Sequence, residues 1–149
     1  MIVALWAGLG GAVWWVLDGM TGEDAAGFLE FEDKDTIALG NQIYQAQCAT
    51  CHGANLEGQP DWQVQDDEGY LPAPPHDETG HTWHHPDAQL MAITKLGTAE
   101  IVGSGYQSRM GGFGDILSDN DISAVLAYIK STWPADVVET HNQINRDSE

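Results

Sequence analysis

Two cysteines and a histidine within five consecutive residues constrain this chain more than any other feature. Cys48 and Cys51 are the only cysteines among its 149 residues, and His52 follows directly. Two thiols three positions apart lie on one helical turn, where each can add across a vinyl group of haem b and form a thioether bond. His52 is then held beneath the iron as the proximal ligand. The motif therefore predicts one covalent haem c, attached through Cys48 and Cys51.

Two other uses of a CxxC pair are less compatible with the chain. A thioredoxin-like redox pair lies at a strand-to-helix junction within a βαβ pattern, and no such alternation of strands is visible in the sequence. A structural zinc site needs a second pair of ligands at knuckle spacing, and the chain has no further cysteine to supply it. Covalent haem remains the favoured interpretation.

The pattern around the motif indicates a small all-α domain. Apolar residues at helical spacing occur in three stretches, and strand alternation is absent. The first stretch begins with Asp35 as its cap and runs into Cys48. The second begins at 85–87 and ends at Gly97. The third opens with the capping box Ser118-Asp119-Asn120-Asp121 and ends before Pro134.

Residues 35–133 resemble a class I mono-haem cytochrome c. In that family the first and last helices cross at a glycine eight residues before the first haem cysteine. An aromatic residue follows four positions later, and another lies on the last helix. Gly40, Tyr44 and Tyr128 occupy these places. The resemblance implies a small all-α fold around the haem and a role in electron transfer.

The same resemblance implies a methionine as the sixth iron ligand, in a loop shortly before the last helix. Met110 occupies that position, and Gly111 stands where many members have proline, which predicts a more mobile loop. Met91 lies on an expected helix, where filling the core is its expected role. Iron bound by His52 and Met110 has no open position for a substrate, so we expect an electron carrier and not an enzyme.

Two further residues acquire roles from the resemblance. Family members carry a proline whose carbonyl accepts a hydrogen bond from the haem histidine, which orients the ring and raises its basicity. Pro74 is the preferred candidate and Pro75 the alternative. A tryptophan in this region often donates to a haem propionate. Trp83 is the candidate, and the alternative is an ordinary core aromatic.

Four histidines cluster in an insert after the motif, at positions 76, 81, 84 and 85. Imidazole ligands suit copper or zinc, so a metal-homeostasis or sensing role is one hypothesis. Against it, no cysteine or second methionine lies close in sequence, and adjacent histidines at a helix start do not easily point at one metal. We expect these side chains to pack at the haem edge instead.

The first seventeen residues contain no charged side chain. A cleaved signal peptide would need a basic start and a small-residue cleavage site, and a buried core helix would need a polar face. Residues 1–17 are therefore predicted to form a transmembrane anchor, with Trp14 and Trp15 at the membrane interface and an acidic linker over 18–34. Its small residues at 4, 8 and 12 allow packing on another transmembrane helix, although such residues are common in membrane helices generally.

The charge of the chain limits its partners. There are 23 Asp and Glu against 5 Lys and Arg, and the formal net charge is −18. A chain this acidic is not expected to bind nucleic acid or anionic lipid headgroups. A partner with a basic docking surface is predicted, or an apolar contact at Phe113 and the neighbouring glycines.

Together these features predict a cytochrome c domain over 35–133, followed by a C-terminal tail over 134–149. Because bacterial c-type haem is attached outside the cytoplasm, the domain is expected on the periplasmic side of the inner membrane. There it would carry single electrons between membrane redox complexes. The alternative is a permanently docked subunit of a larger membrane oxidoreductase.

Overall fold

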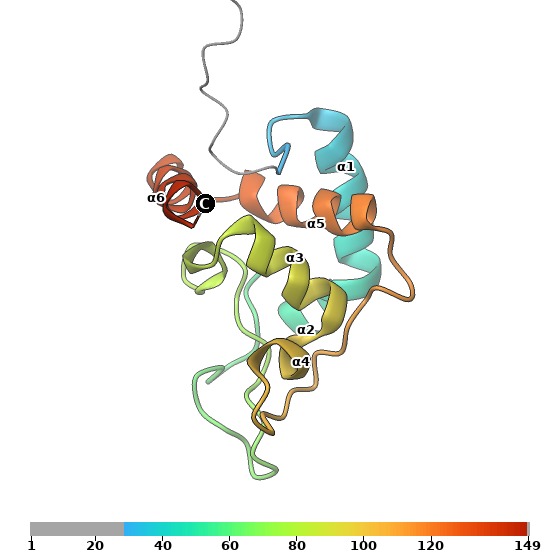
Figure 1. Ribbon diagram of the computed structural model, residues 1–149, viewed down its shortest axis with the longest axis vertical. Coiled ribbons are helices and arrows are strands. Elements are labelled where there is room, and N and C mark those ends of the chain that lie inside the picture. Colours follow the sequence, from blue (N-terminus) through green and yellow to red (C-terminus); the bar gives the residue numbers. More distant parts are fainter. Residues whose placement is uncertain (1–28, 149) are drawn as a thin grey trace, which may run out of the picture.

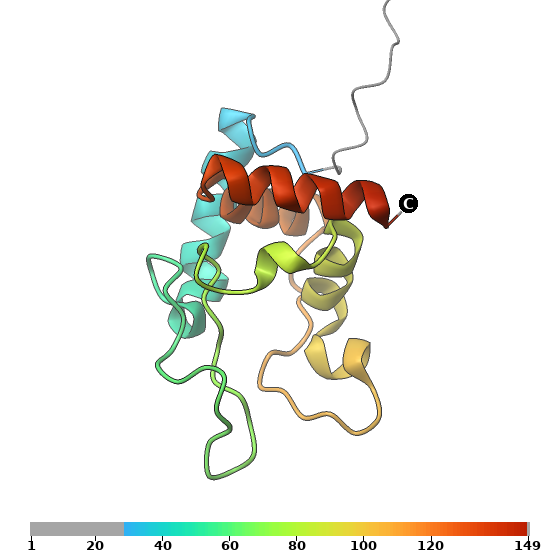
Figure 2. The same ribbon diagram turned by 90° about the vertical axis from the view of Figure 1, so that its left-hand side faces the viewer.

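A computed structural model of the chain describes residues 29–148, and Figures 1 and 2 show that helices dominate it. Between these two residues no strand forms, and the only β-type pairing is an isolated bridge between Gly97 and Gly111. The predicted all-α class is therefore confirmed. In chain order the elements are α1 (Lys34–Ile43), the π-helical turn η1 (Tyr44–Cys48), α2 (Ala49–His52), the 3-10 turn η2 (Thr82–His84), α3 (Asp87–Leu96), α4 (Thr98–Val102), α5 (Asp119–Ser131) and α6 (Ala135–Asp147).

The crossing of α1 and α5 is the central packing contact, as the sequence predicted. Gly40 is buried there, and a Cβ at this position would overlap the carbonyl oxygen of Ala124 and lie 2.8 Å from the Cβ of Tyr128. The rings of Tyr44 and Tyr128 lie beside the crossing, with their centroids 5.5 Å apart. Two backbones approach this closely only where one residue lacks a side chain.

The two crossing helices begin differently from each other. Ser118 and Asp121 form the predicted capping box of α5, in which each side chain accepts a hydrogen bond from the other residue's backbone N–H. At α1 the prediction was wrong by two residues, because the cap is Asp33 and not Asp35. The Asp33 carboxylate accepts from the N–H of Thr36 at 2.7 Å, which lowers its pKa. Asp35 instead lies in the first turn, where its charge suits the helix dipole.

Helix α6 was not predicted, because the residues after Pro134 were expected only as a tail. It packs against η2 and the start of α3 (Figure 2). His141 and Asn145 are its buried residues. The ring Nε2 of His141 lies 3.0 Å from the carbonyl oxygen of His85, and the Asn145 side chain accepts from the N–H of Asp87 at 2.7 Å. These buried contacts are polar, so hydropathy does not reveal them.

The start of the described chain packs on the same end of the domain. Leu29 is buried in the core, and its N–H donates to the Asp87 carboxylate at 3.3 Å. The predicted anchor, residues 1–17, and most of the predicted linker lie outside the described residues. Within residues 29–148 no helix combines the length and the apolar character that a membrane crossing requires.

Candidate functional site

The CxxCH motif spans the junction of η1 and α2. Cys48 ends η1, and Cys51 and His52 lie on the single turn of α2. Both cysteines are free thiols, Cys48 half-buried and Cys51 exposed. Burial is the main reason that the pKa of Cys48 rises to about 11, so this side chain is a neutral thiol at neutral pH. The two thiols thus lie three residues apart, within about one turn of a continuous helical segment.

The ring of His52 is buried and oriented by a backbone carbonyl. Its Nδ1 lies 2.8 Å from the carbonyl oxygen of Pro74, so the Nδ1–H donates to Pro74 and Nε2 is the nitrogen available to a metal. His52 and Pro74 thus make the contact that the sequence analysis expected between them. Burial lowers the pKa of His52, which favours the neutral imidazole that metals bind.

Two aromatic side chains reinforce the position of His52. The hydroxyl of Tyr44, a fully buried residue, donates to the carbonyl oxygen of Gly53 at 2.9 Å. The ring of His76 stacks on that of His52, with centroids 4.0 Å apart. The indole N–H of Trp133 in turn donates to the carbonyl oxygen of His76 at 2.8 Å. Sequence reasoning missed this stacking, although His76 lies only two residues after Pro74.

The histidines of the insert pack mainly against other rings, and one pair of them, His81 and His85, is in edge-to-face contact with centroids 5.4 Å apart. His76 stacks on His52, and its Nδ1 lies 2.7 Å from the hydroxyl of Thr82. His81 stacks on Trp62 with centroids 5.3 Å apart. Over the described range, no three His, Cys, Asp or Glu side chains gather closely enough to hold a metal ion. The structure therefore does not bring these residues into the arrangement that the metal hypothesis needs.

Trp83 makes the contacts of a packed aromatic residue. Its ring is half-buried against the core and stacks on His84 with centroids 3.7 Å apart. Its indole N–H donates to the backbone carbonyl of Glu78 at 3.3 Å. The indole N–H expected to donate to a haem propionate is thus directed at this backbone carbonyl, and the role of Trp83 towards the haem stays a prediction.

Met110 lies half-buried in the loop that connects α4 to α5. Two backbone hydrogen bonds of 3.0 Å fasten this loop to the end of α3, from Phe113 to Thr94 and from Gly114 to Lys95. Gly112 permits the approach, because a Cβ there would lie 2.6 Å from the carbonyl oxygen of Lys95. Met91, by contrast, lies on α3 and packs against the core.

The side chains around the motif fit a haem group. The motif itself presents two thiols and an oriented imidazole, which are groups that hold c-type haem. Large exposed apolar side chains accompany them, as an apolar porphyrin requires. Six of the seven such side chains in the described part of the chain follow His52 in sequence and lie on the segments that flank the motif and Met110: Val64, Leu71, Leu96, Val102, Tyr106 and Ile116.

A family model described as Cytochrome c matches residues 37–133, about two thirds of the chain. The chain belongs to the cytochrome c family. Comparisons with curated proteins and with solved structures gave no match.

Membership of the cytochrome c family establishes the cofactor and the general activity. Cytochromes c hold haem c covalently through cysteine thioethers, and Cys48 and Cys51 provide the spacing. The protein is thus a haem-based electron carrier and not a conventional enzyme. Cytochrome c domains are commonly located outside the cytoplasm.

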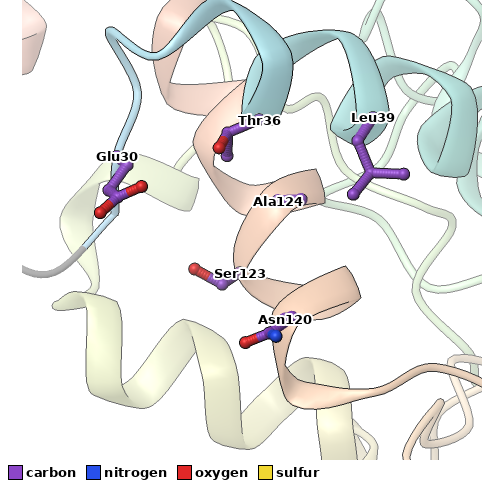
Figure 3. Close-up of a pocket in the computed structure, with 6 residues that line it drawn as sticks. All are labelled: Glu30, Thr36, Leu39, Asn120, Ser123 and Ala124. Carbon is purple, nitrogen blue, oxygen red and sulfur yellow. The ribbon is translucent and has the colours of Figure 1, made fainter.

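This cytochrome c also has a hollow of about 410 Å³ beside the crossing of α1 and α5 (Figure 3). Its walls contain none of the expected haem residues and no group that holds or transfers an electron. We assign it no part in the site. It is lined by Glu30, Thr36, Leu39, Asn120, Ser123 and Ala124.

Proposed function

We propose that this cytochrome c carries single electrons between membrane-bound redox complexes, with its iron held by His52 and Met110. The contact between His52 Nδ1 and the Pro74 carbonyl carries the proposal, since it leaves Nε2 for the iron. Met110 is the better candidate for the other side. Of the two methionines within residues 29–148 it is the one in a loop, whereas Met91 packs against the core.

Each residue has a definite part in this proposal. Haem, when bound, supplies a couple that takes up and releases one electron. The Pro74 carbonyl accepts the Nδ1 proton of His52, which fixes the ring and makes Nε2 more basic. The neutral thioether of Met110 raises the reduction potential. With both His52 and Met110 bound, the iron would have no open position, so the site would exchange electrons without binding a substrate.

The charge distribution supports a partner with a basic docking surface, or one that makes an apolar contact at Phe113 and its neighbouring glycines. Lys95, Arg109 and Arg146 each pair with a carboxylate, and Lys130 is buried. Lys34 is therefore the only exposed lysine or arginine in the described range that has no acidic partner. With a basic partner the bimolecular rate of electron transfer should fall as salt is added. With an apolar contact it should stay nearly constant, and a rate that rises with salt would contradict both.

The location completes the proposal. Residues 1–17, which contain no charged side chain, anchor the protein in the bacterial inner membrane with the haem domain on the periplasmic side. The mass of the mature membrane-bound protein tests this. A chain that retains these residues and needs detergent supports the anchor, and one that begins near residue 20 and dissolves without detergent contradicts it.

The ligand assignment is tested by two matched methionine substitutions. The oxidised protein should show the weak near-infrared absorption band that arises from an iron–methionine bond. Met110→Ala should abolish this band and lower the reduction potential, because the thioether stabilises ferrous iron. Met91→Ala should keep both properties. Loss of the band in Met91→Ala and not in Met110→Ala would overturn the assignment.

A further inference from the structure

The side chain next to Met110 connects two loops that are far apart in sequence. Arg109 donates through Nη1 to Asp66 at 2.5 Å and through Nη2 to Glu68 at 2.6 Å. Its guanidinium also lies over the ring of Tyr70, 4.2 Å from the centroid. One residue thus makes three contacts across to the loop that follows the CxxCH motif. Both loops extend to the same end of the molecule (Figure 1).

The acidic side of this contact is itself well ordered. Asp66 Oδ1 accepts hydrogen bonds from the backbone N–H of Glu68 and of Tyr70, each at 3.0 Å. The backbone of Asp66 also pairs with Tyr70 at 2.9 Å and with Gly69 at 2.9 Å. Residues 66–70 therefore form a closed turn that presents two carboxylates and one aromatic ring to Arg109. A preformed turn loses little conformational freedom when the guanidinium binds, which favours the contact.

Nothing else in the described structure joins these two loops in this way. Over residues 29–148, Arg109 makes the only side-chain hydrogen bonds between residues 59–73 and 103–117. Met110 directly follows Arg109 and is followed by Gly111 and Gly112, which have no side chains to fasten the loop. The position of Met110 therefore depends on its fastening to α3 on one side and on Arg109 on the other.

We propose that Arg109 is a positioning residue for Met110: by binding the turn formed by residues 66–70, it would hold Met110 in place as an iron ligand. The inference rests on the proposed ligation by His52 and Met110. Arg109 itself need not touch the haem. By fixing the backbone just before Met110, it opposes the mobility that Gly111 and Gly112 give the loop, and so disfavours dissociation of the thioether from the iron.

Exogenous imidazole measures this effect, because it binds the ferric iron only when Met110 leaves. We expect Arg109→Gln to raise the affinity of the full-length ferric holoprotein for imidazole about fivefold, the effect of one well-formed ion-pair network. The double variant Asp66→Asn/Glu68→Gln should raise it to a similar extent. Combining all three substitutions should add nothing further, because both variants remove the same contact. The imidazole affinity of Arg109→Lys should lie between those of the wild type and Arg109→Gln, because lysine keeps the charge but lacks the planar guanidinium that donates to two carboxylates at once.

Lys95→Gln is the matched control. It breaks an exposed ion pair with Asp119 of 2.7 Å beside the same loop, but that pair does not reach residues 66–70. It should change the imidazole affinity by less than about twofold. Added salt should raise the affinity of the wild type towards that of Arg109→Gln and leave Arg109→Gln itself nearly unchanged.

The outcomes separate this inference from the function on which it rests. Without an iron–methionine band in the wild type, or with that band intact in Met110→Ala, the proposed ligation fails. If the ligation stands, an Arg109→Gln variant with wild-type imidazole affinity overturns the role of Arg109. The role of Arg109 is also overturned if the change in imidazole affinity of the triple variant equals the sum, in free energy, of the changes in Arg109→Gln and in Asp66→Asn/Glu68→Gln. A change in thermal unfolding without a change in imidazole affinity would also overturn it, because Arg109 would then be merely structural.

Discussion

The two sides of the proposed iron site are built in different ways. His52 lies on a helical turn, is buried, and is held by the Pro74 carbonyl and the stacked ring of His76. Met110 lies in a glycine-rich loop that is fastened by two backbone hydrogen bonds to the end of α3 and by one exposed arginine. The first side belongs to the packed core, and the second is joined to it by surface contacts.

This difference indicates how substitutions on the two sides should behave. Contacts around His52 are shared with the helix crossing that stabilises the whole domain, so damage there should appear as lost folding stability. Contacts around Met110 are local, so damage there should appear as easier ligand exchange while the fold survives. The predictions below test this contrast in order of decreasing effect.

The largest effect is expected at the helix crossing. Gly40→Ala would place a Cβ against the backbone of Ala124, which cannot move without displacing α5. We expect it to cost about 3 kcal/mol of unfolding free energy, at the upper end of overpacking effects, even though alanine favours helix. Gly111→Ala is the loop counterpart, because a Cβ there meets nothing within 4 Å. Denaturant unfolding of the holoprotein should show a large loss for the first variant and almost none for the second.

A smaller effect is expected when one buried hydrogen bond is removed near His52. Tyr44→Phe deletes the hydroxyl that donates to the Gly53 carbonyl and leaves that acceptor without this donor. The cost should be about 1–2 kcal/mol of unfolding free energy. Tyr128→Phe is the control, because the Tyr128 hydroxyl makes no hydrogen bond within the described chain. Equal losses in the two variants would show that ring packing, and not this hydrogen bond, fixes the turn after the motif.

The smallest effect should appear only as a pH dependence. His141 is fully buried, and burial is the main cause that lowers its pKa, with the nearby charge of Lys130 second. Asp87, 3.4 Å away, and the His85 carbonyl act in the opposite direction. The ring of Trp133 packs edge-on against His141, with centroids 5.0 Å apart.

Because the folded state disfavours the protonated ring, the unfolded chain binds the extra proton first as the pH falls. Stability should therefore decrease below about pH 6.5, the ordinary histidine value, and continue to decrease towards the lowered pKa of the folded state. His141→Gln should flatten this part of a stability profile, whereas His84→Gln, at an exposed position, should not. A profile with the same slope in His141→Gln would contradict the assignment.

The sequence was sufficient where a residue's role depends on its neighbours in the chain or on a repeated spacing. The CxxCH motif, the apolar face of α5, its capping box and the glycine at the crossing are of this kind. Helix α6 escaped notice because its two buried residues, His141 and Asn145, are polar, and its hydrophobic contribution to the core is limited to the partly buried Val137 and Val138. The sequence analysis placed the cap of α1 at Asp35 and not at Asp33, because acidic residues occupy both positions. Either can cap a helix, and only the observed start at Lys34 separates them.

Contacts between distant segments were the least predictable. Arg109 and its partners Asp66 and Glu68 are more than forty residues apart, and no spacing rule connects them. His76 stacks on His52 because of the path of the intervening loop, which sequence patterns do not specify. Trp83 was assigned from a resemblance in position alone, and the orientation of its indole N–H depends on the local turn at Glu78.

The place where the chain enters the domain has a consequence for its motion. Leu29 is fixed to the start of α3, and Figure 1 shows the start of the described chain at the opposite end of the long axis from the two loops that Arg109 joins. A domain held through residue 29 is thus held by the end remote from its ligand loop. Rotation about that attachment moves the loop end through an arc whose radius is the length of the domain. If the protein is anchored and shuttles electrons as proposed, a modest change of angle would carry this end from a donor to an acceptor with no change in the fold.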